Sequence, residues 1–206
     1  MEMFIKKRGI FMGNRVEPIR DKRKIATIKN MLKGSNKTRD YILFSLGINL
    51  GLRIGDLLKI QVKDLFDVDD NIRETFEIVE EKTKKRNVVL INENTKEALK
   101  YLIENEPTVL NNRNNHIIYN TRNKYESITR IQAYKLTRSW CDKVGLEEIA
   151  IGCHTLRKTW GYQAHKEGIS IEVIQEKYKH SSTSTTRHYL GIEQKDVNEA
   201  YKKVNL

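Results

Sequence analysis

Apolar residues recur at helical spacing over most of the chain. Residues three and four positions apart share one face of a helix, so this spacing predicts helices that bury one side. Asp40 can cap an apolar helix that runs through Tyr41 and Leu46 and ends near Gly51. Further helices are predicted over Lys24 to Leu32, Ile54 to Ile60, Thr95 to Ile103, Ile131 to Val144, Thr155 to Glu167, Ser170 to Tyr178, Thr183 to Leu190 and Asp196 to Val204.

Two short segments are instead rich in β-branched and aromatic residues, which favour strands. They are Thr75 to Glu80 and Asn87 to Ile91, and the basic run 82–86 separates them. This arrangement predicts a hairpin with a basic tip. His116 to Tyr119 is predicted as a third strand. The whole pattern predicts a mainly α domain that carries a small antiparallel β-sheet, an α+β fold.

The length of 206 residues suits one large domain with a short arm. Residues 1–36 hold several basic clusters and are predicted to form an arm and a short helix. Residues 37–206 are predicted to form the main domain, including the C-terminal helix. Apolar positions in that last helix, from Val197 to Val204, recur at helical spacing, so it must bury one face.

Charge and hydropathy narrow the class of partner. The chain has 38 Lys and Arg against 27 Asp and Glu, a net charge of +11, which favours a polyanion such as nucleic acid or an anionic membrane surface. No stretch approaches the roughly 18 to 20 apolar residues of a membrane span, and the basic start lacks a secretory apolar core. A cytoplasmic protein is expected. Cys141 and Cys153 lack the spacing of a metal site or disulfide framework, so no metal is expected.

The residues with the clearest chemistry occur in an ordered series. His154-Thr155-Leu156-Arg157 is followed by His180 and then by Tyr189, and Gly51-Leu52-Arg53 lies far upstream. Attack on a phosphodiester builds charge on the non-bridging oxygens, which the fixed fork of an Arg guanidinium can bind. A tyrosine hydroxyl with an ordinary pKa near 10 is a suitable nucleophile only when cations or a base activate it.

This series resembles the tyrosine recombinase (phage integrase) family, whose pattern is an Arg after Gly-Leu, a Lys on a β-hairpin, His-x-x-Arg, a second His or Trp, and a Tyr. All five elements occur in order, and the resemblance runs from about residue 37 to 200. It implies the catalytic-domain fold of these enzymes, with Tyr189 as the nucleophile and no cofactor. It also assigns protonation of the departing 5′ oxygen to a hairpin lysine, with Lys82 first and Lys84 or Lys85 as alternatives.

Each residue of the series then has an expected role. Arg53 and Arg157 are predicted to clamp the phosphate, while His154 either accepts the phenol proton or donates to the phosphate. His180 adds a third donor to the developing charge. Asp56, one helical turn from Arg53, is predicted to fix the rotamer of that arginine through an ion pair. Five basic residues are predicted to contact DNA, namely Lys84, Lys85, Arg86, Lys158 and Arg187.

The resemblance implies double-stranded DNA as the partner and four protomers on two DNA sites. The last helix either packs on its own core or docks on a neighbouring protomer. A type IB topoisomerase-like relaxer and a catalytically silent DNA-binding regulator are the alternative functions. Tyr178 and Tyr201 are weaker candidates for the nucleophile, because Tyr178 precedes His180 and Tyr201 lies in an apolar stripe. The chain is either a compact recombinase or a catalytic fragment of a longer one.

Overall fold

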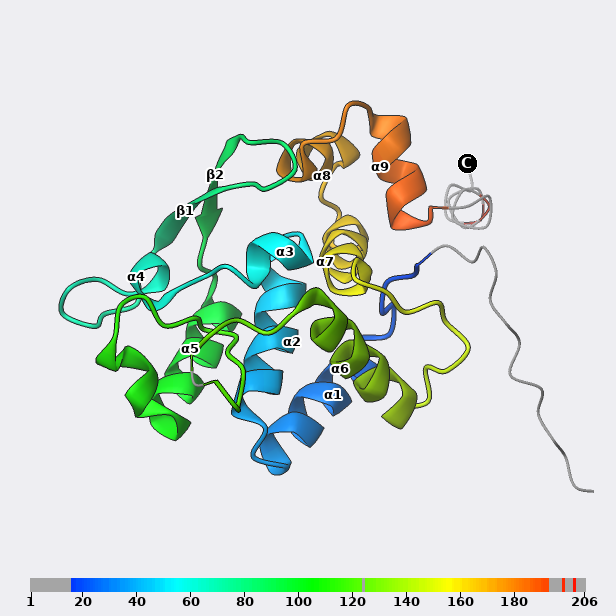
Figure 1. Cartoon of the computed structure of the whole chain (residues 1–206). Coiled ribbons are helices and arrows are strands. Elements are labelled where there is room, and N and C mark those ends of the chain that lie inside the picture. The colour runs from blue at the N-terminus through cyan, green and yellow to red at the C-terminus, as the bar shows by residue number, and fades with distance from the viewer. Residues whose placement is uncertain (1–15, 124, 193–197, 199–201, 203–206) are drawn as a thin grey trace, which may run out of the picture.

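The structure is a computed structural model that describes residues 16–123, 125–192, 198 and 202. Helices make up most of it, and one β-hairpin lies at one end (Figure 1). The helices are α1 (Lys22–Gly34), α2 (Thr38–Leu50), α3 (Ile54–Leu57), α4 (Val62–Leu65), α5 (Glu93–Asn105), the 3₁₀ helix η1 (Pro107–Asn111), α6 (Arg130–Lys143), α7 (Thr155–Lys166), α8 (Ile171–Tyr178) and α9 (Thr183–Leu190). The strands are β1 (Thr75–Val79) and β2 (Arg86–Leu90). The predicted α+β class is confirmed.

Helix α2 lies at the centre of the molecule and packs against α1, α5 and α7 (Figure 1). All residues from Tyr41 to Gly47 are buried, as expected for a helix that is covered on every side. The helix ends at Gly51 with a φ of 61°, a left-handed conformation that glycine adopts without steric cost. A Cβ atom there would also lie 2.9 Å from the Trp160 ring. Backbone conformation and packing therefore both require glycine at the junction between α2 and the segment that carries Arg53.

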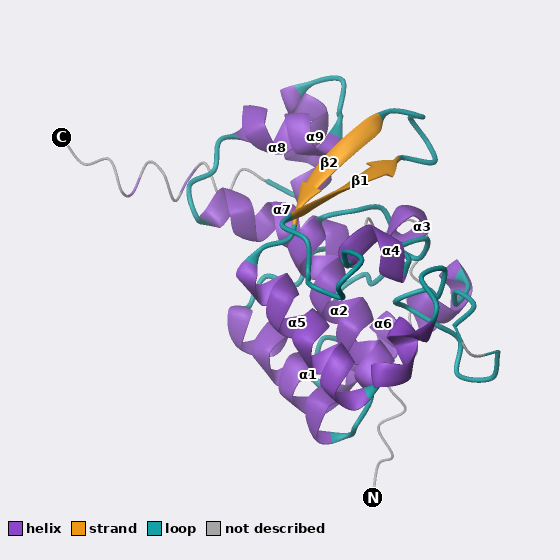
Figure 2. Cartoon of the chain, turned by 90° about the vertical axis from the view of Figure 1, so that its left-hand side faces the viewer, coloured by secondary structure: helices purple, strands orange, loops and turns teal. Residues whose placement is uncertain are grey.

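Strands β1 and β2 form the predicted hairpin, with Thr75 opposite Leu90 and Val79 opposite Arg86. Phe76 and Val89 are buried against the helices, so one face of the hairpin belongs to the core. The turn closes through two backbone hydrogen bonds between Glu80 and residues 84 and 85. Lys84, with a φ of 57°, supplies the left-handed residue that an Asn-Gly pair often provides in hairpins. Figures 1 and 2 show the hairpin at the same end of the molecule as α8 and α9.

Helices α8 and α9 are attached to α7 by a small apolar cluster of their own. Ile174, Tyr178 and Leu190 are fully buried in it, and Trp160 packs against its edge. A Cβ atom at Gly161 of α7 would lie 2.6 Å from Leu190, so glycine allows α9 to approach α7 closely. This cluster fixes the position of Tyr189, the neighbour of Leu190.

Helix α1 packs into the same core as the helices that follow it. Ile19 and Ile28 are completely buried, and Leu32 is 1% exposed. The described part of residues 1–36 is therefore packed against residues 37–192, and the boundary after residue 36 stays a prediction. Residues 1–15 and the predicted helix Asp196 to Val204, apart from residues 198 and 202, lie outside the described residues. Among the described helices, none combines the length and apolar character needed to cross a membrane.

Asp40 does not cap α2, contrary to the sequence prediction. The helix begins two residues earlier, at Thr38, with Lys37 as its N-cap residue and no side-chain cap. Asp40 lies inside the first turn, where its carboxylate accepts a hydrogen bond of 2.5 Å from Arg39. A carboxylate in a first turn still interacts favourably with the helix dipole, which explains why an acidic residue suits this position without capping it.

The segment His116 to Tyr119 does not form a third strand of the hairpin sheet, so this prediction is wrong. Within the described residues the sheet consists of β1 and β2. The two ends of the segment form isolated bridges with Gln61 and Ser127 instead. Residues 117–119 are all buried, whereas side chains of a half-buried strand alternate between core and solvent. The apolar run is a buried connection. Helices α4 and η1, each of at most five residues, were not predicted.

Candidate active site

The predicted catalytic residues come from three separate regions of the chain. Arg53 precedes α3, and Lys82 lies in the hairpin turn. The other four belong to the α7 to α9 region: His154 and Arg157 at the start of α7, His180 between α8 and α9, and Tyr189 in the last turn of α9. The structure brings the two histidines, the two arginines and Tyr189 together, with the Lys82 turn beside them.

The Tyr189 hydroxyl lies 3.1 Å from Nδ1 of His154 and can donate a hydrogen bond to it. The Tyr189 ring also lies 5.0 Å from the His180 ring, measured between centroids. Burial raises the pKa of Tyr189 above its ordinary value of 10, although the charge of Arg157, a hydrogen bond with it and the charge of Arg53 act in the opposite direction. Tyr189 is therefore a neutral phenol before DNA binds, and its attack requires a proton acceptor.

Both histidines are held neutral by their surroundings. Burial lowers the pKa of His154, and the nearby cations Arg157 and Lys158 lower it further. Burial and the charges of Arg157, Arg53 and Lys82 lower the pKa of His180 to about 4. A neutral imidazole can accept a proton, so His154 is suited to take the proton of Tyr189. Nδ1 of His180 lies 3.1 Å from the Thr186 hydroxyl, which orients the ring from within α9.

The lowered pKa of His180 predicts how the stability of the folded protein changes with pH. The pKa of His180 in the fold is about 4, below its ordinary 6.5, so the unfolded chain binds more protons between these values. The folded state should lose stability as the pH falls from about 6.5 to about 4, and His180→Asn should lose less. Thermal unfolding of both proteins at about pH 7 and about pH 4.5 measures the difference. Equal decreases in Tm for the two proteins would contradict a depressed pKa at His180.

Arg157 is the most buried cation of the site, with 2% of the residue exposed. It donates to the carbonyl of Gly51 at 2.8 Å and to the carbonyl of Tyr178 at 3.1 Å. Its guanidinium carbon lies 4.2 Å from the centroid of the Tyr178 ring. Because Gly51 is two residues from Arg53, this contact ties the two arginine motifs together through the end of α2.

Arg53 forms an ion pair with Glu80 and not with Asp56, so the predicted role of Asp56 is wrong. Nη1 of Arg53 lies 2.5 Å from Oε2 of Glu80, a side chain with no exposed surface. Asp56 is 1% exposed and accepts a hydrogen bond of 2.8 Å from the backbone N–H of Glu81. The extended backbone of Arg53 at the N-cap of α3 directs its side chain toward the hairpin, away from the first turn that holds Asp56.

Glu80 was missed by the sequence analysis, although the sequence carries a signal for it. Phe76, Ile78 and Glu80 alternate along the strand, and Phe76 faces the core. This alternation places the carboxylate of Glu80 on the inward face. A buried carboxylate requires partners, and a strand end next to a phosphate-binding site is a place to look for them.

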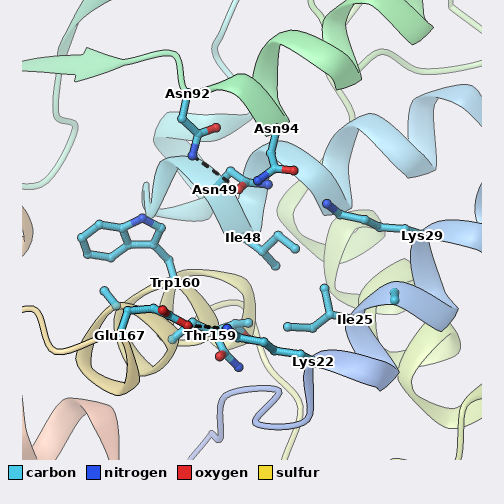
Figure 3. Close-up of a pocket in the computed structure, with 13 residues that line it drawn as sticks. Lys22, Ile25, Lys29, Ile48, Asn49, Asn92, Asn94, Thr159, Trp160 and Glu167 are labelled. Atoms are coloured by element: carbon cyan, nitrogen blue, oxygen red, sulfur yellow. Dashed lines mark hydrogen bonds and ion pairs between the residues drawn. The ribbon is translucent and has the colours of Figure 1, made fainter.

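The turn between β1 and β2 that carries Lys82, called the lysine turn below, borders a cleft beside the predicted catalytic residues. Its lining includes Arg53, Lys82, Arg130, Cys153 and His154. Lys82 is exposed, as are the predicted DNA contacts Lys84, Lys85, Arg86 and Arg187. A second cavity, shown in Figure 3, lies among α1, α2, α5 and α7, and the predicted catalytic residues do not line it.

Lys158, a predicted DNA contact, is buried, and its contact with DNA stays a prediction. Only 4% of the residue is exposed. Its ammonium donates to the carbonyl of Val16 at 2.8 Å and lies 4.7 Å from the centroid of the Tyr189 ring. The segment before α1 covers this face of α7, and sequence spacing on α7 alone does not reveal that.

Within the described part of the chain, no group of three or more His, Cys, Asp or Glu side chains is arranged to hold a metal ion.

The fold and this set of side chains define a DNA breaking and rejoining enzyme with a tyrosine nucleophile, and comparison with known proteins agrees. The model of the phage integrase family matches residues 20–195. A probable integrase/recombinase, YoeC of Bacillus subtilis, is 40% identical over 187 residues, which are 91% of this chain and 96% of that protein. Tyrosine recombinase XerC of Thermodesulfovibrio yellowstonii is 29% identical over an alignment of 179 positions that covers 80% of this chain and 54% of XerC.

Solved structures show the same fold. The XerA recombinase superposes with a TM-score of 0.72 at 19% identity, over 95% of this chain and 67% of that chain. The XerH site-specific recombinase bound to its difH substrate superposes with a TM-score of 0.72 at 18% identity, over 92% of this chain and 53% of that chain. The chain belongs to the phage integrase family and carries its tyrosine recombinase catalytic domain. It spans nearly all of the Bacillus relative but about half of XerC.

Proposed function

We propose that this chain is a site-specific DNA recombinase that cleaves and rejoins DNA through a 3′-phosphotyrosyl intermediate on Tyr189. The observation that carries the proposal is the hydroxyl of Tyr189 at 3.1 Å from His154, with Arg157 and Arg53 close by. Binding DNA requires phosphate contacts but no nucleophile aligned with a base. This arrangement therefore favours an enzyme over a silent DNA-binding regulator.

The cleavage step distributes its charges and protons over the assembled residues. The Tyr189 oxygen bonds to phosphorus as its proton passes to Nδ1 of His154, and the bond from phosphorus to the 5′ oxygen breaks. Arg53, Arg157 and His180 stabilise charge on the non-bridging oxygens. Lys82 gives a proton to the departing 5′ oxygen. The phosphate ester keeps the bond energy, so the 5′ hydroxyl of a partner strand can attack it and rejoin the DNA without a cofactor.

The exposed cations around the cleft supply the DNA contacts of the proposal. Lys84, Lys85 and Arg86 extend along the hairpin turn and the start of β2, and Arg187 lies on the outer side of α9. Cations on such a rim bind phosphates and fix the orientation of the duplex, while base contacts specify sequence. We place the enzyme in the cytoplasm, with access to double-stranded DNA.

Related proteins support a multimeric assembly on DNA. A lambda integrase dimer is bound to its core site in a structure that matches this chain with a TM-score of 0.63 at 18% identity. For this chain we propose four protomers on two DNA sites. We also propose that the C-terminal helix, predicted over Asp196 to Val204, docks its apolar face on a neighbouring protomer and couples assembly to the position of Tyr189.

A plasmid assay tests recombination against the two alternatives. Supercoiled plasmid carrying two copies of the DNA that flanks the gene of this chain is incubated with the protein. A recombinase is expected to delete or invert the segment between the copies. Equal relaxation of a plasmid without these copies, and no rearrangement, would instead identify a topoisomerase-like relaxer. Binding to the copies without cleavage or rearrangement would identify a regulator.

A further inference from the structure

Glu80 links two parts of the predicted site, the Arg53 guanidinium and the turn that carries Lys82. It directly follows β1, two residues before Lys82, and its side chain has no exposed surface. One carboxylate oxygen accepts hydrogen bonds from Nη1 of Arg53 at 2.5 Å and from the hydroxyl of Thr83 at 2.8 Å. The other accepts a hydrogen bond from the side-chain amide of Asn87 at 3.2 Å. A single oxygen therefore touches the predicted phosphate clamp and the turn that carries the predicted acid.

The surroundings keep Glu80 ionised. Burial by itself would raise the pKa of its carboxyl, but hydrogen bonds from Thr83 and Arg53 and the charges of Arg53 and Arg157 outweigh burial and lower the pKa. A buried carboxylate is costly unless cations and hydrogen-bond donors surround it, and this site supplies both. Its negative charge also offsets the repulsion between the two guanidinium groups before a phosphate arrives.

The contact orients Arg53 without consuming it. A guanidinium has five N–H donors in a fixed plane, and the ion pair with Glu80 uses Nη1. Fixing one edge of the plane fixes the direction of the remaining donors. Because the plane is rigid, a carboxylate on one edge determines where the opposite edge can meet a phosphate.

The same carboxylate holds one side of the lysine turn. Thr83 is bound through its hydroxyl, and the Glu80 backbone closes the turn with residues 84 and 85. On the other side of Lys82, the N–H of Glu81 is bound to Asp56. Both neighbours of Lys82 are thus anchored to buried carboxylates. The Lys82 side chain is exposed, but the backbone that carries it is fixed relative to Arg53.

We propose that Glu80 is a positioning residue that fixes the turn carrying Lys82 and the Arg53 guanidinium relative to each other. The acid and the clamp can then reach the same phosphate. The proposal rests on the recombinase function proposed above. Glu80 touches neither DNA nor the reacting atoms; it acts through Arg53 and through Thr83. Loss of this coupling should impair the chemical step and leave DNA binding intact, because removing a negative charge does not weaken attraction to phosphates.

The test compares two leaving groups. A nicked duplex with an ordinary 5′ oxygen at the cleavage site requires a proton for departure, whereas a duplex with sulfur in place of that bridging oxygen does not, since a thiol is several pKa units more acidic than an alcohol. Glu80→Gln should slow adduct formation on the oxygen substrate by about 10- to 100-fold at saturating DNA, as expected when reacting groups are misplaced by about 1 Å. On the sulfur substrate the deficit should shrink, as it should for Lys82→Ala.

A second variant and a control keep the test decisive. Thr83→Val breaks the link to the turn but keeps the pair between Arg53 and Glu80, so its smaller deficit should vanish on sulfur. Asn87→Ala removes the third partner of Glu80 without touching the clamp or the turn, so its ratio of rates on the two substrates should equal that of the wild type. DNA affinity of Glu80→Gln should be unchanged or tighter.

Several outcomes would overturn the proposal. Wild-type cleavage by Glu80→Gln and Thr83→Val would remove the positioning role, and equal deficits on oxygen and sulfur would show that Glu80 does not act through the lysine turn. If the wild type itself forms no adduct, the proposed recombinase function fails, and the inference fails with it. If the wild type forms an adduct that requires Tyr189, and Glu80→Gln is as active as the wild type, only the positioning role of Glu80 is refuted.

Discussion

Tyr189→Phe is expected to abolish the covalent protein–DNA adduct while leaving the fold and DNA binding intact. Phenylalanine lacks the oxygen that bonds to phosphorus, but its ring can keep the packing against the rings of Tyr178 and His180. Loss of the hydrogen bond to His154 at this partly exposed position should cost at most about 1 kcal/mol. The measurement uses nicked duplexes and denaturing electrophoresis, in which an adduct migrates more slowly than free protein.

Tyr178→Phe is the matched control for this experiment. Tyr178 is a neighbouring tyrosine that is fully buried, and its hydroxyl donates to the backbone carbonyl of Arg157. Losing that hydrogen bond should lower stability by about 1 to 3 kcal/mol, yet the adduct should still form. Adduct formation by Tyr189→Phe, or its loss only in Tyr178→Phe, would contradict the assignment of the nucleophile.

Arg53→Ala and Arg157→Ala are each expected to slow cleavage by about a hundredfold or more, the scale seen when a preorganised oxyanion donor is removed. Both variants also remove a partner from buried groups. Arg157→Ala removes the side-chain donor to the carbonyls of Gly51 and Tyr178, and Arg53→Ala removes the cation paired with Glu80, which keeps its hydrogen bonds from Thr83 and Asn87. Because an unpaired buried charge can cost about 3 to 5 kcal/mol, cleavage must be measured well below the Tm of each variant.

Conservative and remote substitutions separate catalysis from folding. Arg53→Lys keeps a cation near Glu80 but loses the planar fork, so most of the deficit in cleavage rate should remain. Arg23→Ala removes an exposed cation of α1 that pairs with Asp21, and its cleavage rate at saturating DNA should match the wild type. Near-normal rates in both Arg53→Ala and Arg157→Ala would refute the proposed clamp.

Much of the site was predictable because its residues occur in short motifs with fixed local geometry. His154 and Arg157 are three residues apart at the start of one helix, so their side chains share a face. Gly51 could be recognised as a helix end. Its left-handed backbone and its close approach to Trp160 explain why a glycine lies two residues before Arg53. The helices were predictable for the same reason, since local periodicity largely determines them.

Contacts between distant segments were not predictable in this way. Asp56 is three residues from Arg53, and this sequence proximity made it the expected partner. The ion pair is instead formed by Glu80, which lies 27 residues from Arg53 in the sequence, where β1 meets the hairpin turn. The choice depends on how the hairpin packs on α3, which no local pattern encodes. The burial of Lys158 has the same origin, because the residue that covers its ammonium, Val16, lies 142 positions earlier.

The third strand failed for a related reason. An apolar run of three residues fits either a strand or a buried connection, and only its neighbours in space distinguish the two. Residues 116–119 have loop segments around Gln61 and Ser127 as neighbours, and not the edge of the hairpin. Residues 117–119 are buried, as their hydrophobic character favours, but they do not pair with the hairpin.

The assignment of Tyr189 as the nucleophile is tested by identifying the atom that bonds to DNA. Nicked duplexes from the DNA flanking the gene of this chain are used to trap the adduct, which is then digested with protease and nuclease and sequenced by mass spectrometry. We expect a 3′-nucleotide phosphate attached to the side chain of Tyr189. Attachment to Tyr178, Tyr201 or any other residue, or no adduct from a folded, DNA-bound protein, would contradict it.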